Sequence, residues 1–409
     1  MDAEDALTIG ARVRKIRSRR GLSLDVAAGL AGISKPYLSA LELGQRGFNR
    51  RGLLEDLASA LGCSVADLTG QPYLPVDRAT ADAMTMVPGI EIAICDCTLD
   101  DVPDIPARPV TELAQLARQA NTYRDEARYA LAGRDLDTVL SELHVHAVSG
   151  DSDTRRAALA ALVEACIAAS GTVRVLGHLS LAVTLARRGY DAAERLGDPA
   201  LTAFAVWFRA GMLTRLGARH RAATVLGDAL VAVESAADPT AADKGPAQAA
   251  GMLHLASAQL ASREGRSGDA DTHLALAAEL ANATDECNDL RCHFGPANVT
   301  AWSVAIGVEL QRGPEAAERA AADIPQLVAV LASADRRSGL YLDIARGWAQ
   351  AGGDRDAEVI RHLDAADRIA PTRIRNDPIA RDLLLTLDRR AQRQVWELDS
   401  LRNRFGVGD

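Results

Sequence analysis

The feature that most limits the fold is a series of glycine-centred helix stops after about residue 110. They read LAGRD, RLGDP, RLGAR, REGRSGD, QRGPE and QAGGDRD. Gly takes positive φ at little cost, and the Asp, Pro or charged residues beside it stop one helix and start the next. From about Thr111 onward, the chain is therefore predicted to be helix after helix.

Pairs of alanines, each 12 residues apart, lie on either side of four of these stops. The first Ala lies in the middle of one helix and the second lies early in the next, so small side chains let paired helices touch. Aromatic residues make up only 4% of the chain, so its core must be built from Ala, Leu and Val. This pattern predicts an α-solenoid of helical hairpins, with longer units than the ~34 residues of a regular tetratricopeptide repeat. The pairs are Ala210 and Ala222, Ala258 and Ala270, Ala305 and Ala317, and Ala345 and Ala357.

The first 70 residues differ from the rest of the chain in charge. The whole chain has a net charge of −9, whereas residues 1–70 hold 10 Lys and Arg against 8 Asp and Glu. The basic residues cluster in RVRKIRSRR and RGFNRR. Because the local field governs phosphate binding more than the average charge does, this segment can bind nucleic acid although the chain is acidic.

Residues 6–70 have the pattern of five short helices. Ser23 and Ser34 stand where the second and third helices need N-caps, and Gly32 supplies the turn between them. Pro36 falls in the first turn of the third helix, where its missing N–H costs no hydrogen bond. The third helix keeps a polar N-terminal half on its outer side, which is the arrangement of a helix-turn-helix.

Two segments of this region, GLSLDVAAGLAGISKPYLSALELGQR and LLEDLASALG, resemble the Cro and phage-repressor (xenobiotic-response-element, XRE) family of regulators. The resemblance implies a lambda-repressor-like domain at 1–70 that binds double-stranded DNA as a homodimer. Two positions differ from many members of that family. Leu24 stands where Gln often contacts a phosphate, and Ala40 offers only a methyl group to a base.

Nine residues are therefore predicted to bind DNA. The start of the third helix is expected to cap the helix and contact base edges, through Ser34, Lys35, Tyr37 and Ser39. The segment that follows is expected to hold phosphates, through Gln45, Arg46, Asn49, Arg50 and Arg51.

Residues 71–110 hold six of the 15 prolines, which predicts a Pro-rich linker with a short strand at IEIAI. The chain beyond residue 70 resembles actinobacterial regulators that fuse such a DNA-binding domain to tetratricopeptide-like (TPR-like) helices. The segments that carry this resemblance include TGQPYLPVDRA, CHFGPANVTAW and AADRIAPTRIRNDP. The resemblance implies that residues 111–409 form a regulatory and dimerisation domain. That domain would sense a peptide or small-molecule effector, or bind a partner protein.

In such repeats certain positions of each first helix face a concave groove, and they select two tryptophans and several polar residues here. Aromatic planes with a few polar groups suit a ligand, although tryptophans can also simply fill an Ala-rich core. Asn298 could hold a peptide backbone or, as the other interpretation, cap its helix. The predicted ligand-binding residues are Trp207, Arg215, Gln259, Asn298, Trp302 and Glu309.

Other chemistries have little support in the sequence. The six cysteines show no paired C-x2-C spacing, so no metal site and no cofactor are predicted. No P-loop, G-x-S-x-G or H-E-x-x-H motif occurs, so no catalytic residue is predicted and the chain is not expected to be an enzyme.

The start of the chain has no signal-peptide pattern, and no apolar run reaches the ~18 residues that a membrane span needs, which predicts a cytoplasmic protein without membrane contact. The function predicted is that of a sequence-specific transcriptional regulator. Two alternatives stay open. One is a protein-interaction adaptor that has lost DNA binding, and the other is an antitoxin-like repressor whose helical domain masks a toxin.

Overall fold

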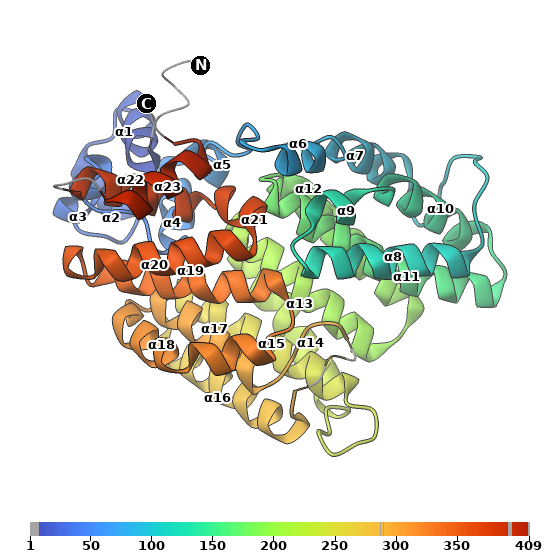
Figure 1. The fold of residues 1–409 in the computed structure, drawn as a ribbon. Coiled ribbons are helices and arrows are strands. Elements are labelled where there is room, and N and C mark those ends of the chain that lie inside the picture. The colour runs from blue at the N-terminus through green and yellow to red at the C-terminus, as the bar shows by residue number, and fades with distance from the viewer. Residues whose placement is uncertain (1–7, 287, 289, 392–394, 408–409) are drawn as a thin grey trace.

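The computed structural model describes residues 8–286, 288, 290–391 and 395–407, and the regular elements in these ranges are helices. The first five helices form a domain at one end of the molecule, drawn in blue in Figure 1. They are α1 (Ile9–Arg19), α2 (Leu24–Leu30), α3 (Lys35–Glu42), α4 (Arg51–Leu61) and α5 (Val65–Thr69). Residues 8–69 are called the head below, and the helices from α6 onward are called the body.

The helix ends in the head follow the signals in the sequence. The Ser23 hydroxyl accepts a hydrogen bond from the Val26 N–H at 3.2 Å, and the Ser34 hydroxyl accepts one from the Tyr37 N–H at 3.3 Å. Gly32 has a φ of +67° in the turn between the two helices, where a side chain would be strained. The prediction of two capped helices joined by a glycine turn is confirmed.

Residues 71–110 do not form the linker that their prolines predict. They contain two helices, and IEIAI lies inside the second of them, so the predicted strand is wrong. Pro88 is tolerated because it falls in the first turn, and Ile90 is buried in the core of the body. The two helices are α6 (Arg78–Met84) and α7 (Val87–Asp96).

The body continues as a row of helical hairpins in which each helix packs on its neighbours along the chain (Figure 1). Its first part comprises α8 (Val110–Asp125), α9 (Tyr129–Gly133), α10 (Leu136–Ser149), α11 (Ser152–Val175), α12 (Leu179–Leu196), α13 (Pro199–Leu216) and α14 (Arg219–Glu234). Its second part comprises α15 (Gly245–Arg263), α16 (Ser267–Thr284), α17 (Pro296–Glu309), α18 (Gly313–Val330), α19 (Ala334–Gln350) and α20 (Asp356–Ile369). The all-helical fold, with a helix-turn-helix head followed by a helical domain, is confirmed.

The alanine pairs mark four of these hairpins, namely α13–α14, α15–α16, α17–α18 and α19–α20. Seven of the eight alanines are buried, as close contact between paired helices requires. Ala357 is the exception and is exposed. A short 3-10 turn (Gly353–Arg355) precedes α20, and Val359, instead of Ala357, is the buried residue in the first turn of this helix.

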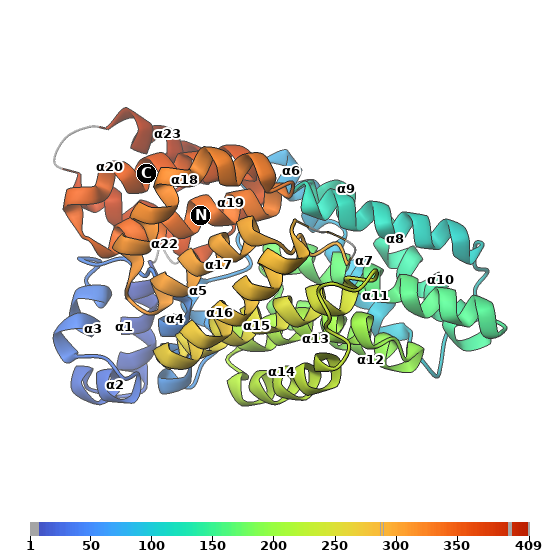
Figure 2. The ribbon, with the colours of Figure 1, turned by 90° about the horizontal axis from the view of Figure 1, so that it is seen from below.

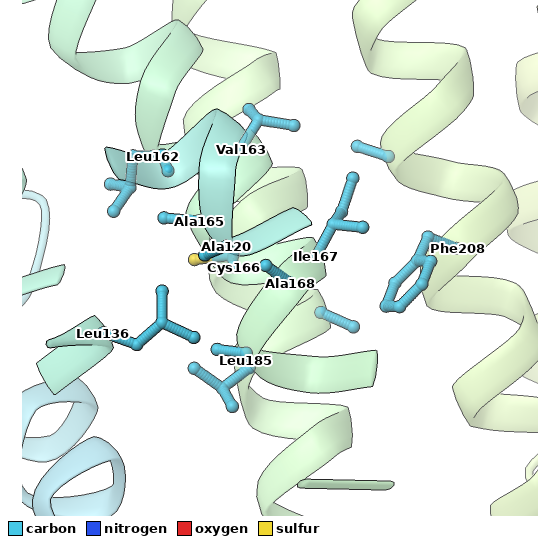
Figure 3. Packing of buried hydrophobic residues seen from close by; sticks show 14 of the residues in the cluster. Ala120, Leu136, Leu162, Val163, Ala165, Cys166, Ile167, Ala168, Leu185 and Phe208 are labelled. Carbon is cyan, nitrogen blue, oxygen red and sulfur yellow. The ribbon is translucent and has the colours of Figure 1, made fainter. Parts of the chain in front are cut away.

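Helix α11 is the central apolar element of the body. Its 24 residues include an 18-residue window with a mean hydropathy of 1.6, so among the described residues one helix is long and apolar enough to cross a membrane, contrary to the expectation from the sequence. However, 83% of its apolar window is buried inside the protein. Figure 3 shows Leu162, Cys166 and Ile167 of α11 among Leu185 and Phe208 of the next two helices. Such burial is that of a core helix.

The row of hairpins curves until its first helices meet its last, and Figure 2 shows α9 beside the start of α19. The Tyr129 hydroxyl donates to Asp335 at 2.6 Å, and the Ser333 hydroxyl donates to the Asp125 carboxylate at 2.9 Å. Helices α8 and α19 also contact each other. The concave side of the body is therefore closed into a ring, and its interior is lined by side chains from both ends of the row.

The last helices return to the head, as the red and blue elements of Figure 1 show. Ile379 and Leu383 of α22 are buried in the same apolar cluster as the core of the head. The Phe48 N–H donates to the Asp382 carboxylate at 2.8 Å. Head and body therefore share a core. The C-terminal helices are α21 (Pro371–Arg375), α22 (Pro378–Arg390) and α23 (Trp396–Phe405).

Candidate nucleic-acid interface and central cavity

Helix α3 presents its predicted DNA-reading side to solvent. Leu38 and Leu41 are fully buried and fix the rotation of the helix. On the other side Lys35 is exposed, as is the capping residue Ser34, whereas Tyr37 and Ser39 are half-buried. These side chains are thus brought together on one accessible face at the start of the helix. Figure 2 shows α3 at the outer edge of the molecule.

A buried ion pair fixes the C-terminal end of α3. Arg17 of α1 binds Glu42 through two hydrogen bonds, of 2.6 Å from Nε and 2.8 Å from Nη2. Its third nitrogen, Nη1, donates to the Leu22 carbonyl in the turn before α2 at 2.8 Å. The hydrogen bond with Glu42 raises the pKa of Arg17. One guanidinium thus holds α1, the start of α2 and the end of α3 in a fixed relation, which pre-organises the exposed face.

Gln45 and Arg46 follow α3 and are exposed. Their backbone N–H groups both donate to the Ala40 carbonyl, at 2.9 and 3.3 Å, which ties this segment to the end of α3. The Arg46 guanidinium lies 5.8 Å from the centre of the Tyr37 ring. An exposed cation beside an aromatic hydroxyl on one face is an arrangement that can bind a phosphate and an adjacent base edge.

The last three predicted phosphate contacts lie where the head meets the body. Arg51 forms an ion pair with Asp377 at 2.7 Å, and only 17% of its side chain is exposed. The Asn49 carbonyl accepts a hydrogen bond from Arg346 at 2.9 Å. Arg50 is half-buried and gives no side-chain cap to α4. Arg51 and Asn49 therefore serve the head–body contact, instead of the open loop expected for them.

The N-terminus of α4 is capped by a residue of the body. The two carboxylate oxygens of Glu309 accept hydrogen bonds from the N–H groups of Arg51 and Gly52, at 3.0 and 3.1 Å. Glu309 also forms an ion pair with Arg346 at 2.5 Å. Burial would raise the pKa of Glu309, but Arg346, Arg263 and the two N–H groups outweigh it and hold the pKa at about 2. This cap is therefore charged near neutral pH.

A second buried carboxylate, one turn further along α4, completes the contact. Glu55 pairs with Arg219 at 2.9 Å and with Arg263, both from the body. Arg219 also donates to the Gly52 carbonyl at 3.1 Å. Breaking a buried pair leaves an uncompensated charge at a cost of several kcal/mol, so these contacts fix the head in one orientation.

All six predicted ligand-binding residues line one cavity of about 190 Å³ inside the ring: Trp207, Arg215, Gln259, Asn298, Trp302 and Glu309. The two tryptophans are half-buried, so each shows part of its surface to this cavity. Glu309 is already bound to the head. The cap interpretation of Asn298 is wrong, because Gly295 is the N-cap of α17 and Asn298 accepts a hydrogen bond from Arg336 at 2.6 Å.

The comparisons with known proteins concern the head alone. Residues 8–69 match the family model of a helix-turn-helix domain. The match covers the five head helices and supports a DNA-binding regulator. No curated protein and no solved structure matches the chain. The tetratricopeptide-like character of the body, the homodimer and the actinobacterial origin stay predictions.

Sequence reasoning missed most of the arginines of the cavity. Eight arginines line it against four carboxylates, and of these only Arg215 was predicted to bind a ligand, whereas Arg51 was predicted to bind DNA. The sequence could have indicated Arg174, because it is one of few charged residues near the end of the long apolar helix α11. Arg336 and Arg373 lie in charged stretches, where nothing in the sequence distinguishes an inward arginine from a solvated one.

Proposed function

We propose that this chain is a sequence-specific transcriptional regulator of the cytoplasm that has no enzymatic activity. Its head would read DNA through the exposed face of α3, and its body would sense a small effector in the central cavity. The observation that carries the proposal is the accessible start of α3, with Lys35 exposed beside Tyr37 and Arg46 on a helix-turn-helix domain.

The joint between head and body supports a sensing role. Arg51 and Glu309 both line the cavity, and both also hold the N-terminus of α4. A ligand that changes the charge balance of the cavity acts on the residues that orient the head. The effect would be a shift between head orientations that suit and do not suit a two-fold DNA site, in a homodimer with two heads.

The test begins with genome-wide mapping of the DNA bound by the full-length protein. Affinity for the mapped site is then measured for the wild type, Lys35→Ala and the control Arg134→Ala, which removes an exposed charge from the body. We expect Lys35→Ala to weaken binding by roughly tenfold or more, because a base contact contributes ~1–3 kcal/mol. Unchanged affinity, or no bound site, would remove the proposed interface.

A further inference from the structure

The arginines of the central cavity are not all balanced by carboxylates. Five of the eight have an acidic partner within ion-pair distance, for example Arg373 with Asp335 at 3.0 Å. Within the part of the chain that the structure describes, Arg174 and Arg215 have no hydrogen bond and no ion pair, and Arg336 has no carboxylate partner. Three guanidinium groups thus share one small cavity without a carboxylate in direct contact, and Asp335 and Asp343 act on Arg174 and Arg336 only from beyond ion-pair distance.

This excess of positive charge is costly without a ligand. Burial, together with the nearby Arg174, Arg51 and Arg263, lowers the pKa of Arg215 well below its usual value. Burial also lowers the pKa of Arg336 to about 10, and its Nη2 is buried without a hydrogen-bond partner. A buried polar group without a partner destabilises a fold, so such groups in a cavity are candidates for binding a ligand.

The cavity also offers flat apolar surface beside the cations. The Arg336 guanidinium lies 5.1 Å from the centre of the Trp302 ring, and Trp207 stacks on Phe204 with ring centres 5.3 Å apart. Guanidinium groups bind carboxylates and phosphates through paired N–H donors, and indole rings pack on planar or apolar groups. The wall is thus suited to a ligand with a charged end and a flat or apolar body.

The size of the cavity restricts the ligand further. Its volume of about 190 Å³ is below the ~300 Å³ at which pockets for drug-sized molecules begin. A second cavity of about 90 Å³ shares Arg51, Arg174, Arg215 and Arg373 with it. This space suits a compact metabolite rather than a peptide of several residues.

We propose that the central cavity binds a small organic anion with at least two negative charges, which Arg174, Arg215 and Arg336 neutralise beside Trp207 and Trp302. This inference names the ligand class for the sensing role in the proposed function, and it rests on that function only for its biological meaning. Binding of the anion is a property of the body, and it can be measured without DNA.

The experiment measures the Tm of the full-length protein, and binding by calorimetry, with millimolar citrate, adenosine monophosphate (AMP) and uncharged adenosine. Citrate and AMP separate carboxylate from phosphate ligands, and adenosine tests whether the flat group suffices. The variants are Arg174→Gln and Arg215→Gln, with Arg134→Gln as the control, because Arg134 is exposed and lies outside the cavity.

We expect at least one of the two anions to raise the Tm, adenosine not to raise it, and Arg134→Gln to behave as the wild type. Both cavity variants should lose at least about tenfold in affinity, since each removes a charge-assisted contact. Without an anion, both should melt at or above the wild-type Tm, because they remove repulsion.

Three results would overturn the proposal. The first is that neither anion raises the Tm of the wild type. The second is that the rise persists in either cavity variant. The third is that either variant melts well below the wild type without an anion, since its arginine then holds the fold. None of these results bears on DNA binding, so the proposed function of the head stands or fails separately.

Discussion

The face of α3 and the wall of the central cavity are both rich in cations, but they differ in how those cations are solvated. Lys35 and Arg46 are exposed to water, where a charge costs little and an ion pair contributes ~0–1 kcal/mol. Arg174 and Arg215 are enclosed by the ring, where an unpaired charge is destabilising. An exposed cation needs no partner within the chain, whereas an enclosed one indicates either an ion pair or a ligand.

The joint between these two regions makes the comparison testable. Asn49, Arg51 and Gly52 follow the exposed segment by only a few residues, yet the body binds all three. A few residues of chain thus separate cations that are available to DNA from groups that are bound to the cavity wall.

The largest effect is expected from removing the cap on α4. Glu309→Ala leaves Arg346 buried without this partner and frees two N–H groups, which should lower the free energy of unfolding by about 3–5 kcal/mol. Denaturant unfolding measures this change. Glu318→Ala, which truncates an exposed glutamate of α18, is the matched control and should change stability by less than ~0.5 kcal/mol. If Glu309→Ala changed the free energy of unfolding by no more than the control does, the joint would not be held as described.

A pair of glycines in the head tests how α3 is positioned. A Cβ on Gly10 would lie 2.0 Å from the Leu41 carbonyl oxygen, so Gly10→Ala must push α1 away from α3, at a cost of about 3 kcal/mol. Gly29 has open space around it, and Gly29→Ala should stabilise α2 by about 0.5–1 kcal/mol. Thermal unfolding of both variants measures whether stability falls in Gly10→Ala and rises in Gly29→Ala. If stability changed in the same direction in both variants, α1 and α3 would not pack as closely as described.

Asp382 gives the contact between α22 and the head a pH dependence. Burial raises its pKa to about 6, against the lowering effect of the Phe48 N–H. Because this carboxyl has a pKa of ~3.9 in the unfolded chain, the folded state binds the proton more tightly, and its contribution to stability falls as the pH rises from about 4 to 6. The fall should amount to about 2 kcal/mol.

Denaturant unfolding between these pH values measures the fall, and Asp382→Asn should abolish this part of it. Glu309 titrates with the opposite sign and at lower pH, since its pKa is about 2, so the two effects can be separated. An equal pH slope in wild type and variant would exclude Asp382 as its source.

The sequence predicted what depends on local chemistry. Ser23, Ser34 and Gly32 specify the ends of α2 and α3 through their own hydrogen bonds and φ values, so they could be assigned without a structure. The buried alanines placed the hairpins, because close helix packing requires small residues at fixed spacing. The same spacing selected five residues that share one cavity, and Asn298, chosen for its place after Phe294, Gly295 and Pro296, lines it too.

What the sequence did not show depends on contacts between distant segments. The binding of Arg51 by Asp377 joins residues 326 positions apart, and no local pattern encodes it. The prolines of 71–110 indicated a linker, but Pro88 sits in a first turn that tolerates it. The closure of the body into a ring, through Tyr129 and Asp335, likewise depends on the summed curvature of all the hairpins.

The most direct test of the account is the salt dependence of DNA binding by Arg46→Ala and Arg51→Ala, on the site found by genome-wide mapping. An exposed phosphate contact contributes about 0.9 to the slope of log affinity against log salt concentration. We predict that Arg46→Ala reduces the steepness of this slope by about that amount, whereas Arg51→Ala leaves it unchanged, because Arg51 is bound to Asp377. An equal reduction in both variants, or none in Arg46→Ala, would contradict the separation of the exposed face from the joint.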